Sequence, residues 1–141
     1  MLSELHEYEL TILEKHLDTF GHVNNATYLE LYEEARWDLI SNRNFGLRDI
    51  QKAKIGPVIL RIDIAYKAEL RNREKIKIVT QTKEYKNKLV MVLEQKMVKE
   101  DGTVASSAML EIGLFDLKER RLIVPTVEWL KAIGVSEQPP Q

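Results

Sequence analysis

The stretch of sequence that decides the fold is DTFGHVNNATYL, residues 18–29. It opens with the carboxylate of Asp18 and includes the point at which a helix is predicted to begin, after Asn24. Asn24 is a suitable N-cap because its side chain can accept hydrogen bonds from the free amides of the first turn. A helix start also presents unpaired N–H groups and the positive end of the helix dipole. These residues therefore indicate parts needed for acyl transfer, although a turn with an N-cap is an alternative interpretation.

The predicted helix covers residues 25–41 and has one broad apolar band. The members of this band are Tyr28, Leu29, Leu31, Tyr32, Ala35, Leu39 and Ile40. Two residues break the pattern, because Arg36 falls inside the band and Trp37 falls on the polar side. Arg36 either has a buried partner or extends its charge to solvent. Trp37 either contacts another subunit or packs on its own chain.

The rest of the chain predicts an antiparallel sheet. Strands are expected over residues 6–15, 58–67, 75–83, 88–99 and 104–115, and short helices over 47–54 and 126–133. In the second strand, Val58, Leu60, Ile62, Ile64 and Tyr66 are predicted to share one face. Short connections between the later strands favour antiparallel pairing. The fold class is therefore α+β, with one long helix against one sheet.

Composition narrows the possible functions. The 141 residues suit one domain, expected over 1–135, followed by a flexible tail at 136–141. A formal net charge of −1 gives no general attraction to nucleic acid or to an anionic membrane. The absence of cysteine excludes disulfides and thiolate metal sites, and no histidine has convincing metal-ligand spacing. Without a signal-like start or an apolar span, we expect a cytoplasmic protein with no metal and no cofactor.

Residues 18–29, followed by EEARW at residues 33–37, resemble the signature of 4-hydroxybenzoyl-CoA thioesterase-like hot-dog proteins. The resemblance implies a hot-dog fold, in which the antiparallel sheet wraps around the long central helix. It implies an acyl-CoA thioesterase, with CoA as part of the substrate. It also implies protomers joined edge to edge, as a homodimer or homotetramer with active sites at the subunit interface.

The resemblance assigns roles to individual residues. It implies that Asp18 is the catalytic general base or nucleophile and that the backbone N–H of Asn25 polarises the thioester carbonyl. His22 would be a further catalytic residue beside the thioester, where Asn24 also lies. Gly21 would let the substrate approach the backbone.

Binding of the rest of the substrate is assigned to other residues. Tyr28 and Tyr32 are candidates to line the acyl cavity, with packing in the core as the alternative. The CoA phosphates require cations, for which the candidates are Arg71, Arg73, Lys86 and Lys88, although solvated turn charge is the favoured explanation of these residues.

The chain departs from the family at one turn. Arg73 stands where the family usually has glycine, and Glu74 where it usually has aspartate. This departure bears on the geometry of the turn and on any contact that it makes with CoA.

Two other functions fit the same residues. A hot-dog hydratase of enoyl thioesters would use a histidine and a carboxylate, such as His22 and Asp18. A non-catalytic module that binds acyl ligands would need no reactive group.

Overall fold

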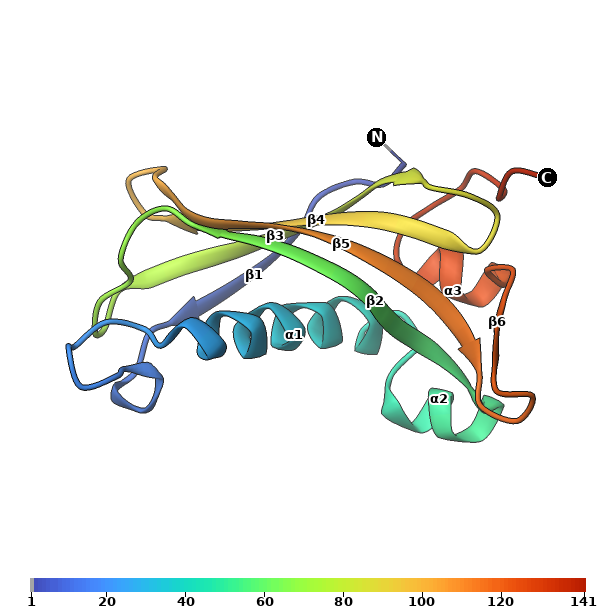
Figure 1. Cartoon of the computed structure of the whole chain (residues 1–141), viewed down its shortest axis with the longest axis horizontal. Coiled ribbons are helices and arrows are strands. Elements are labelled where there is room, and N and C mark those ends of the chain that lie inside the picture. Colours follow the sequence, from blue (N-terminus) through green and yellow to red (C-terminus); the bar gives the residue numbers. More distant parts are fainter. Residues whose placement is uncertain (1) are drawn as a thin grey trace.

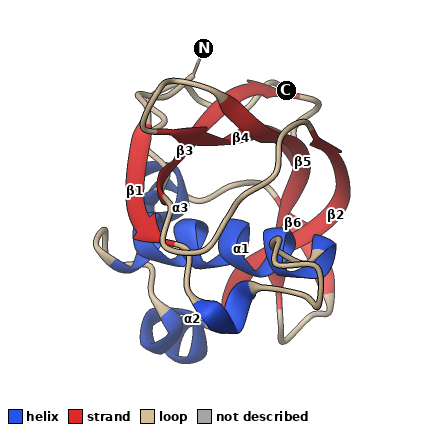
Figure 2. Ribbon diagram, turned by 90° about the vertical axis from the view of Figure 1, so that its left-hand side faces the viewer, coloured by secondary structure: helices blue, strands red, loops and turns tan. Residues whose placement is uncertain are grey.

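The computed structural model describes residues 2–141, in which one antiparallel sheet curves over a long helix (Figures 1 and 2). The strands are β1 (His6–Thr11), β2 (Ile55–Tyr66), β3 (Lys75–Tyr85), β4 (Val90–Lys99), β5 (Val104–Asp116) and β6 (Arg121–Ile123). The helices are α1 (Asn25–Ser41), α2 (Leu47–Ala53) and α3 (Val127–Ala132). The strand order is β1-β3-β4-β5-β2, and β6 pairs with the end of β5. An antiparallel sheet wrapped around one central helix confirms the predicted α+β hot-dog fold.

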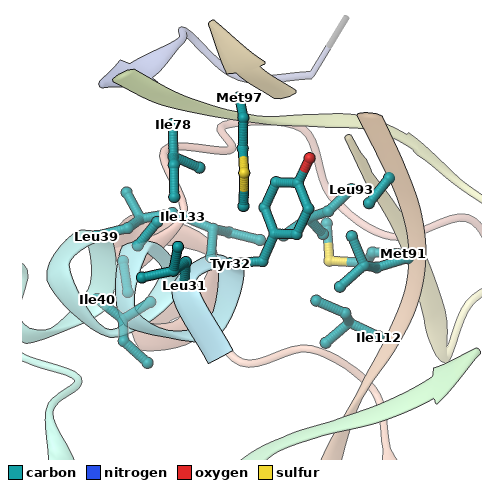
Figure 3. Close-up of a cluster of buried hydrophobic side chains, with 14 of the residues drawn as sticks. Leu31, Tyr32, Leu39, Ile40, Ile78, Met91, Leu93, Met97, Ile112 and Ile133 are labelled. Atoms are coloured by element: carbon teal, nitrogen blue, oxygen red, sulfur yellow. The ribbon is translucent and has the colours of Figure 1, made fainter. Parts of the chain in front are cut away.

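The core lies between α1 and the concave face of the sheet. Figure 3 shows Leu31, Tyr32, Leu39 and Ile40 of α1 facing the buried side chains Ile78, Met91, Leu93, Met97 and Ile112 of the sheet. Complete burial of one such aliphatic side chain contributes about 1.5–3 kcal/mol, so this face holds the helix in place. Leu29, which the sequence placed in the buried band, is 38% exposed, because it faces the open side of the helix near β2.

A polar network inside this core gives Arg36 a buried partner. Its Nη1 donates to Oε1 of Gln95 at 2.9 Å, and Gln95 is completely buried. The Gln95 amide in turn donates to the carbonyl oxygen of Tyr32 at 3.1 Å and to Oγ1 of Thr80 at 3.0 Å. Burial lowers the pKa of Arg36. Arg36 thus has a partner in the core, and Trp37 is half-buried against its own chain rather than fully outward.

The predicted alternation in β2 is wrong for its first half. Directly opposite residues of an antiparallel pair point to the same face. The register shifts between Ile59 and Arg61, so that Ile59 lies opposite the buried Ile112 and Ile62 lies opposite the buried Leu110. A bulge inserts one extra residue, and the strand then changes the face to which alternate side chains point. Ile59, not Leu60, therefore shares the concave face with Ile62.

The ends of several elements also differ from the prediction. The first strand stops at Thr11 rather than at residue 15, because Glu14–His16 form a single 3-10 turn. In this turn the backbone N–H of Leu13 donates to Nδ1 of His16 at 2.9 Å. The short strand β6 was not predicted. Within residues 2–141, no helix has the length and apolar character needed to cross a membrane.

The tail expected at residues 136–141 has one anchor. The Tyr85 hydroxyl donates to the carbonyl oxygen of Glu137 at 2.6 Å.

Candidate active site

The loop before α1 is a tight, hydrogen-bonded turn. Leu17 and Val23 form an isolated antiparallel bridge across its base. The backbone N–H of Asp18 donates to the carbonyl of His22 at 2.8 Å, and that of Gly21 donates to the carbonyl of Asp18 at 3.1 Å. Gly21 has a φ of +81°, a left-handed conformation that favours glycine. Gly21 thus closes the turn that brings Asp18 and His22 together.

The same turn orients the Asp18 carboxylate. Its Oδ1 accepts hydrogen bonds from the backbone N–H groups of Phe20 at 2.8 Å and His22 at 3.4 Å. Its second oxygen accepts none from residues 2–141. One oxygen therefore fixes the side chain, and the other can take a proton from water or attack a carbonyl carbon.

The start of α1 leaves one amide free. Oδ1 of the N-cap Asn24 accepts from the backbone N–H of Ala26 at 2.9 Å, as predicted for an N-cap. The Asn24 carbonyl accepts from the N–H of Thr27 at 2.9 Å. The backbone N–H of Asn25, by contrast, has no acceptor among residues 2–141. It lies at the positive end of the helix dipole and can donate to a developing oxyanion.

Asp18 and Asn25 line the same open cavity, which measures about 420 Å³. The other lining residues are His22, Val23, Tyr28, Tyr66, Lys67, Ala68 and Glu69. A volume of this size lies within the range of ligand pockets, which is about 300–1,000 Å³. The cavity therefore gathers a carboxylate, a free helix N–H and an imidazole around space for a small group.

Five residues of this cavity were not recognised in the sequence, and two of them, Tyr66 and Glu69, contact the predicted site residues. The Tyr66 hydroxyl donates to the carbonyl oxygen of Asn25 at 3.0 Å, and its ring packs edge-on against Tyr28, with centroids 4.9 Å apart. Oε2 of Glu69 lies 3.1 Å from Nε2 of His22. Tyr66 ends an alternating strand and Glu69 lies in a charged turn, so neither had a sequence signal that distinguished it from its neighbours.

The remaining predicted substrate residues lie in different places. Tyr28 is buried and lines the cavity, so it both packs in the core and forms a wall. Tyr32 is 1% exposed and lies away from the cavity, and its hydroxyl donates to Oγ of Ser106 at 2.8 Å. The structure therefore places Tyr32 in the core, which is the alternative position raised by the sequence. Gly21 and Asn24 shape the loop and the helix start but do not line the cavity.

The four candidate phosphate-binding cations do not lie together in the folded structure. Arg73 is held by Glu14 through two hydrogen bonds of 2.8 Å. Lys86 pairs with Glu111, and Lys86 and Lys88 follow the end of β3 that is farther from the cavity. Only Arg71, with a side chain 74% exposed, lies beside the cavity, near Glu69.

The structure shows which backbone conformation occurs at position 73, where the family usually has glycine. Arg73 has a φ of +62°, so the backbone keeps the left-handed turn that glycine adopts most easily.

A hot-dog fold in which a carboxylate and the first residue of the long helix line one cavity fits the class of hot-dog thioester hydrolases. Comparison with known proteins agrees, because a model described as the Thioesterase-like superfamily matches residues 13–134. The long-chain acyl-CoA thioesterase FadM of Escherichia coli (strain K12) is 30% identical over 108 residues, which are 77% of this chain and 81% of FadM. The chain belongs to the thioesterase-like superfamily and is a thioester hydrolase, which confirms the family resemblance.

Solved structures support the same assignment. The crystal structure of YbaW, a probable thioesterase from Escherichia coli, is 28% identical with a TM-score of 0.78, covering 89% of this chain and 94% of YbaW. Slr0204, a 1,4-dihydroxy-2-naphthoyl-CoA thioesterase from Synechocystis, has a TM-score of 0.82 at 16% identity, covering 92% of this chain and 96% of Slr0204. At that identity the likeness to Slr0204 shows the fold alone.

Proposed function

We propose that the protein hydrolyses an acyl-CoA thioester to a free acid and CoA, with Asp18 as general base or nucleophile. The observation that carries this proposal is that one cavity is lined by both Asp18, whose second carboxylate oxygen accepts no hydrogen bond from residues 2–141, and Asn25, whose N–H has no acceptor there. The thioester carbonyl oxygen accepts from the Asn25 N–H. The carbonyl carbon then lies open to attack from the side of Asp18.

Charge grows on the carbonyl oxygen as the attack proceeds. The Asn25 N–H and the dipole of α1 stabilise this charge, and loss of one such donor typically costs about 3 to 4 kcal/mol in the barrier. Asp18 either takes a proton from the attacking water or attacks the carbon itself to give an anhydride, which water then opens. In both routes the C–S bond breaks and CoA leaves as a thiolate.

One relative and one surface of the chain support a long acyl group as substrate. FadM, which is 30% identical, is a long-chain acyl-CoA thioesterase. The α1–β2 side of the molecule is apolar and open, because Leu29 is 38% and Ile62 is 36% exposed. Farther along this side lies a second, largely apolar cavity of about 160 Å³, whose lining includes Trp37 and Ile59. An acyl chain starting at Asn25 would follow this side toward Trp37.

We also propose that two copies join along β2 to complete the site. Among residues 2–141, β2 pairs on one side only, with β5. Leu60 is 46% and Ile59 is 39% exposed, and a long apolar edge strand is a template for pairing with another chain. A two-fold pairing of this edge, alone or within a tetramer, would cover these side chains and place the partner along the strand that ends in Tyr66, which lines the cavity. Light scattering at several concentrations tests this assembly.

Arg71 is the best placed candidate for the CoA phosphates, because it is exposed beside the cavity. The proposals for Arg73, Lys86 and Lys88 are weakened by their contacts with Glu14 and Glu111 or by their position.

The central experiment replaces Asp18 with asparagine and follows thiol release across acyl-CoA esters of increasing chain length. General base catalysis contributes about 100- to 10,000-fold, so Asp18→Asn should lose at least about a hundredfold in kcat. Binding of acyl-CoA, measured by calorimetry, should persist. The control is Glu30→Gln, which removes the same charge at an exposed position of α1.

Two other results would exclude the proposal. A wild-type protein that binds acyl-CoA without releasing thiol is a binding module. A protein that removes the absorbance of an enoyl-CoA without releasing thiol is a hydratase.

A further inference from the structure

The cavity contains a contact between a histidine and a carboxylate that the proposed attack on the thioester does not use. Oε2 of Glu69 lies 3.1 Å from Nε2 of His22, and both side chains line the same cavity as Asp18. Nη2 of Arg71 lies 3.7 Å from the same Glu69 oxygen, on the outer side of the pair. A histidine paired with a carboxylate beside a reactive carboxylate is an arrangement used in acid–base catalysis.

The backbone holds the two partners opposite each other. His22 forms an isolated antiparallel bridge with Arg71, and the backbone N–H of Val23 donates to the carbonyl of Leu70 at 3.2 Å. Leu70 is completely buried and anchors this segment in the core. Glu69 therefore faces His22 because two chain segments pair there, and not only because two long side chains happen to meet.

Several charged groups lie around His22. Two carboxylates line the cavity with it, Asp18 from its own loop and Glu69 from the segment after β2. Two cations lie nearby, because Lys67 lines the same cavity and Arg71 approaches Glu69. The phenol groups of Tyr28 and Tyr66 complete the set of titratable groups that line this cavity with His22.

We propose that Glu69 is a positioning residue that orients the His22 ring toward the thioester, and that His22 is the general acid for the CoA sulfur. This inference rests on the proposed thioesterase function. As the C–S bond breaks, its electron pair goes to sulfur, and the imidazolium gives one proton to that thiolate. The proton lost by the attacking water returns the imidazole to its protonated form, so the cycle is balanced.

This assignment gives the two sides of the reaction to different groups. Asp18 acts on the attacking oxygen and needs to be ionised, whereas His22 acts on the leaving sulfur and needs to be protonated. A thiolate leaves fairly easily without help, so the acid should contribute only about tenfold, below the range of about 100- to 10,000-fold that is usual for general acid–base catalysis. The ion pair is 39% and 56% exposed and contributes little to stability, so its loss should not unfold the protein.

The test compares two leaving groups on the same acyl chain. With the CoA ester, Glu69→Gln should lower kcat about tenfold, and His22→Asn should do the same or more. With the thiophenyl ester, both variants should react at the wild-type rate, because thiophenolate leaves without a proton. Glu69→Gln added to His22→Asn should have no further effect, since both changes remove one function. Glu30→Gln is the control for charge, and thermal melts check folding.

The outcomes separate this inference from the proposed function. Equal slowing of both esters by Glu69→Gln, or an effect that adds to that of His22→Asn, overturns the role of the pair. The role of the pair is also overturned if Glu69→Gln leaves the rate with the CoA ester unchanged while Asp18→Asn abolishes turnover. In that case the thioesterase proposal stands. No thiol release by the wild-type protein from either ester overturns both.

Discussion

We expect Gln95→Leu to lower the free energy of unfolding by about 3 kcal/mol. This substitution tests whether the hydrogen bonds of Gln95 hold α1 under the sheet. Leucine is similar to glutamine in volume, so repacking is a small effect. The substitution removes the acceptor of Arg36 and the donors to the Tyr32 carbonyl and the Thr80 hydroxyl. The hydrogen bond to the cation is worth about 2 kcal/mol, and the two neutral bonds about 1 kcal/mol each.

The greater hydrophobicity of leucine returns about 1 kcal/mol of this sum, which leaves the net loss near 3 kcal/mol. Urea unfolding followed by circular dichroism measures it, provided that the slope m stays constant. The melting temperature should fall by about 10 °C for a chain of this length.

A double-mutant cycle with Arg36→Met identifies the cause. If the loss comes from a buried cation without an acceptor, the double variant should be more stable than the sum of the single changes predicts, by about 1–2 kcal/mol. Additive effects, or a loss below about 1 kcal/mol for Gln95→Leu, would refute this explanation. Arg36 would then reach solvent with its charge, as long basic side chains often do.

Two further predictions concern tyrosines of the core and the cavity. Tyr66→Phe removes the hydrogen bond to the Asn25 carbonyl but keeps the ring, so kcat should fall about threefold to tenfold, from roughly 1 kcal/mol, with KM unchanged in steady-state assays. Burial raises the pKa of Tyr32 to about 12 in the folded protein. Because the unfolded chain loses this proton first, stability should be full below pH 10 and fall as pH rises toward 12. Tyr32→Phe should flatten this part of the curve in urea titrations.

The course of β2 shows how far a hydrophobic pattern can be interpreted. The alternation of apolar and polar residues and the frequent β-branched side chains both indicate a strand over this stretch, and a strand is found there. This pattern could not predict the bulge between Ile59 and Arg61, since the run of apolar residues from Val58 to Leu60 fits either face. Only pairing with β5 chooses between the two, because Ile112 and Leu110 need partners on the buried face. The exposed Leu60 is therefore a consequence of tertiary structure.

The candidate site also contains residues that the sequence could predict and residues that only the fold brings together. Asp18, His22 and Asn25 lie within eight residues, and a loop that enters a helix has to keep them close, so their association was predictable. Tyr66 and Glu69 come from a segment about forty residues later, and the contacts with Asn25 and His22 exist only once β2 lies beside α1. A tyrosine at a strand end and a glutamate in a charged turn are ordinary residues by themselves.

Arg73 illustrates why charge alone did not identify the binding residues. A non-glycine residue in the left-handed region is disfavoured by about 1–2 kcal/mol. Two contacts offset this at Arg73, because its backbone N–H donates to Ile12 at 2.7 Å and its guanidinium binds both oxygens of Glu14. An arginine engaged in holding its own turn is a poor ligand for phosphate, whereas the Arg71 side chain, two residues away, is 74% exposed and approaches Glu69 only to 3.7 Å. The two arginines look alike in the sequence, and only their partners in the fold separate a structural cation from one that can meet CoA.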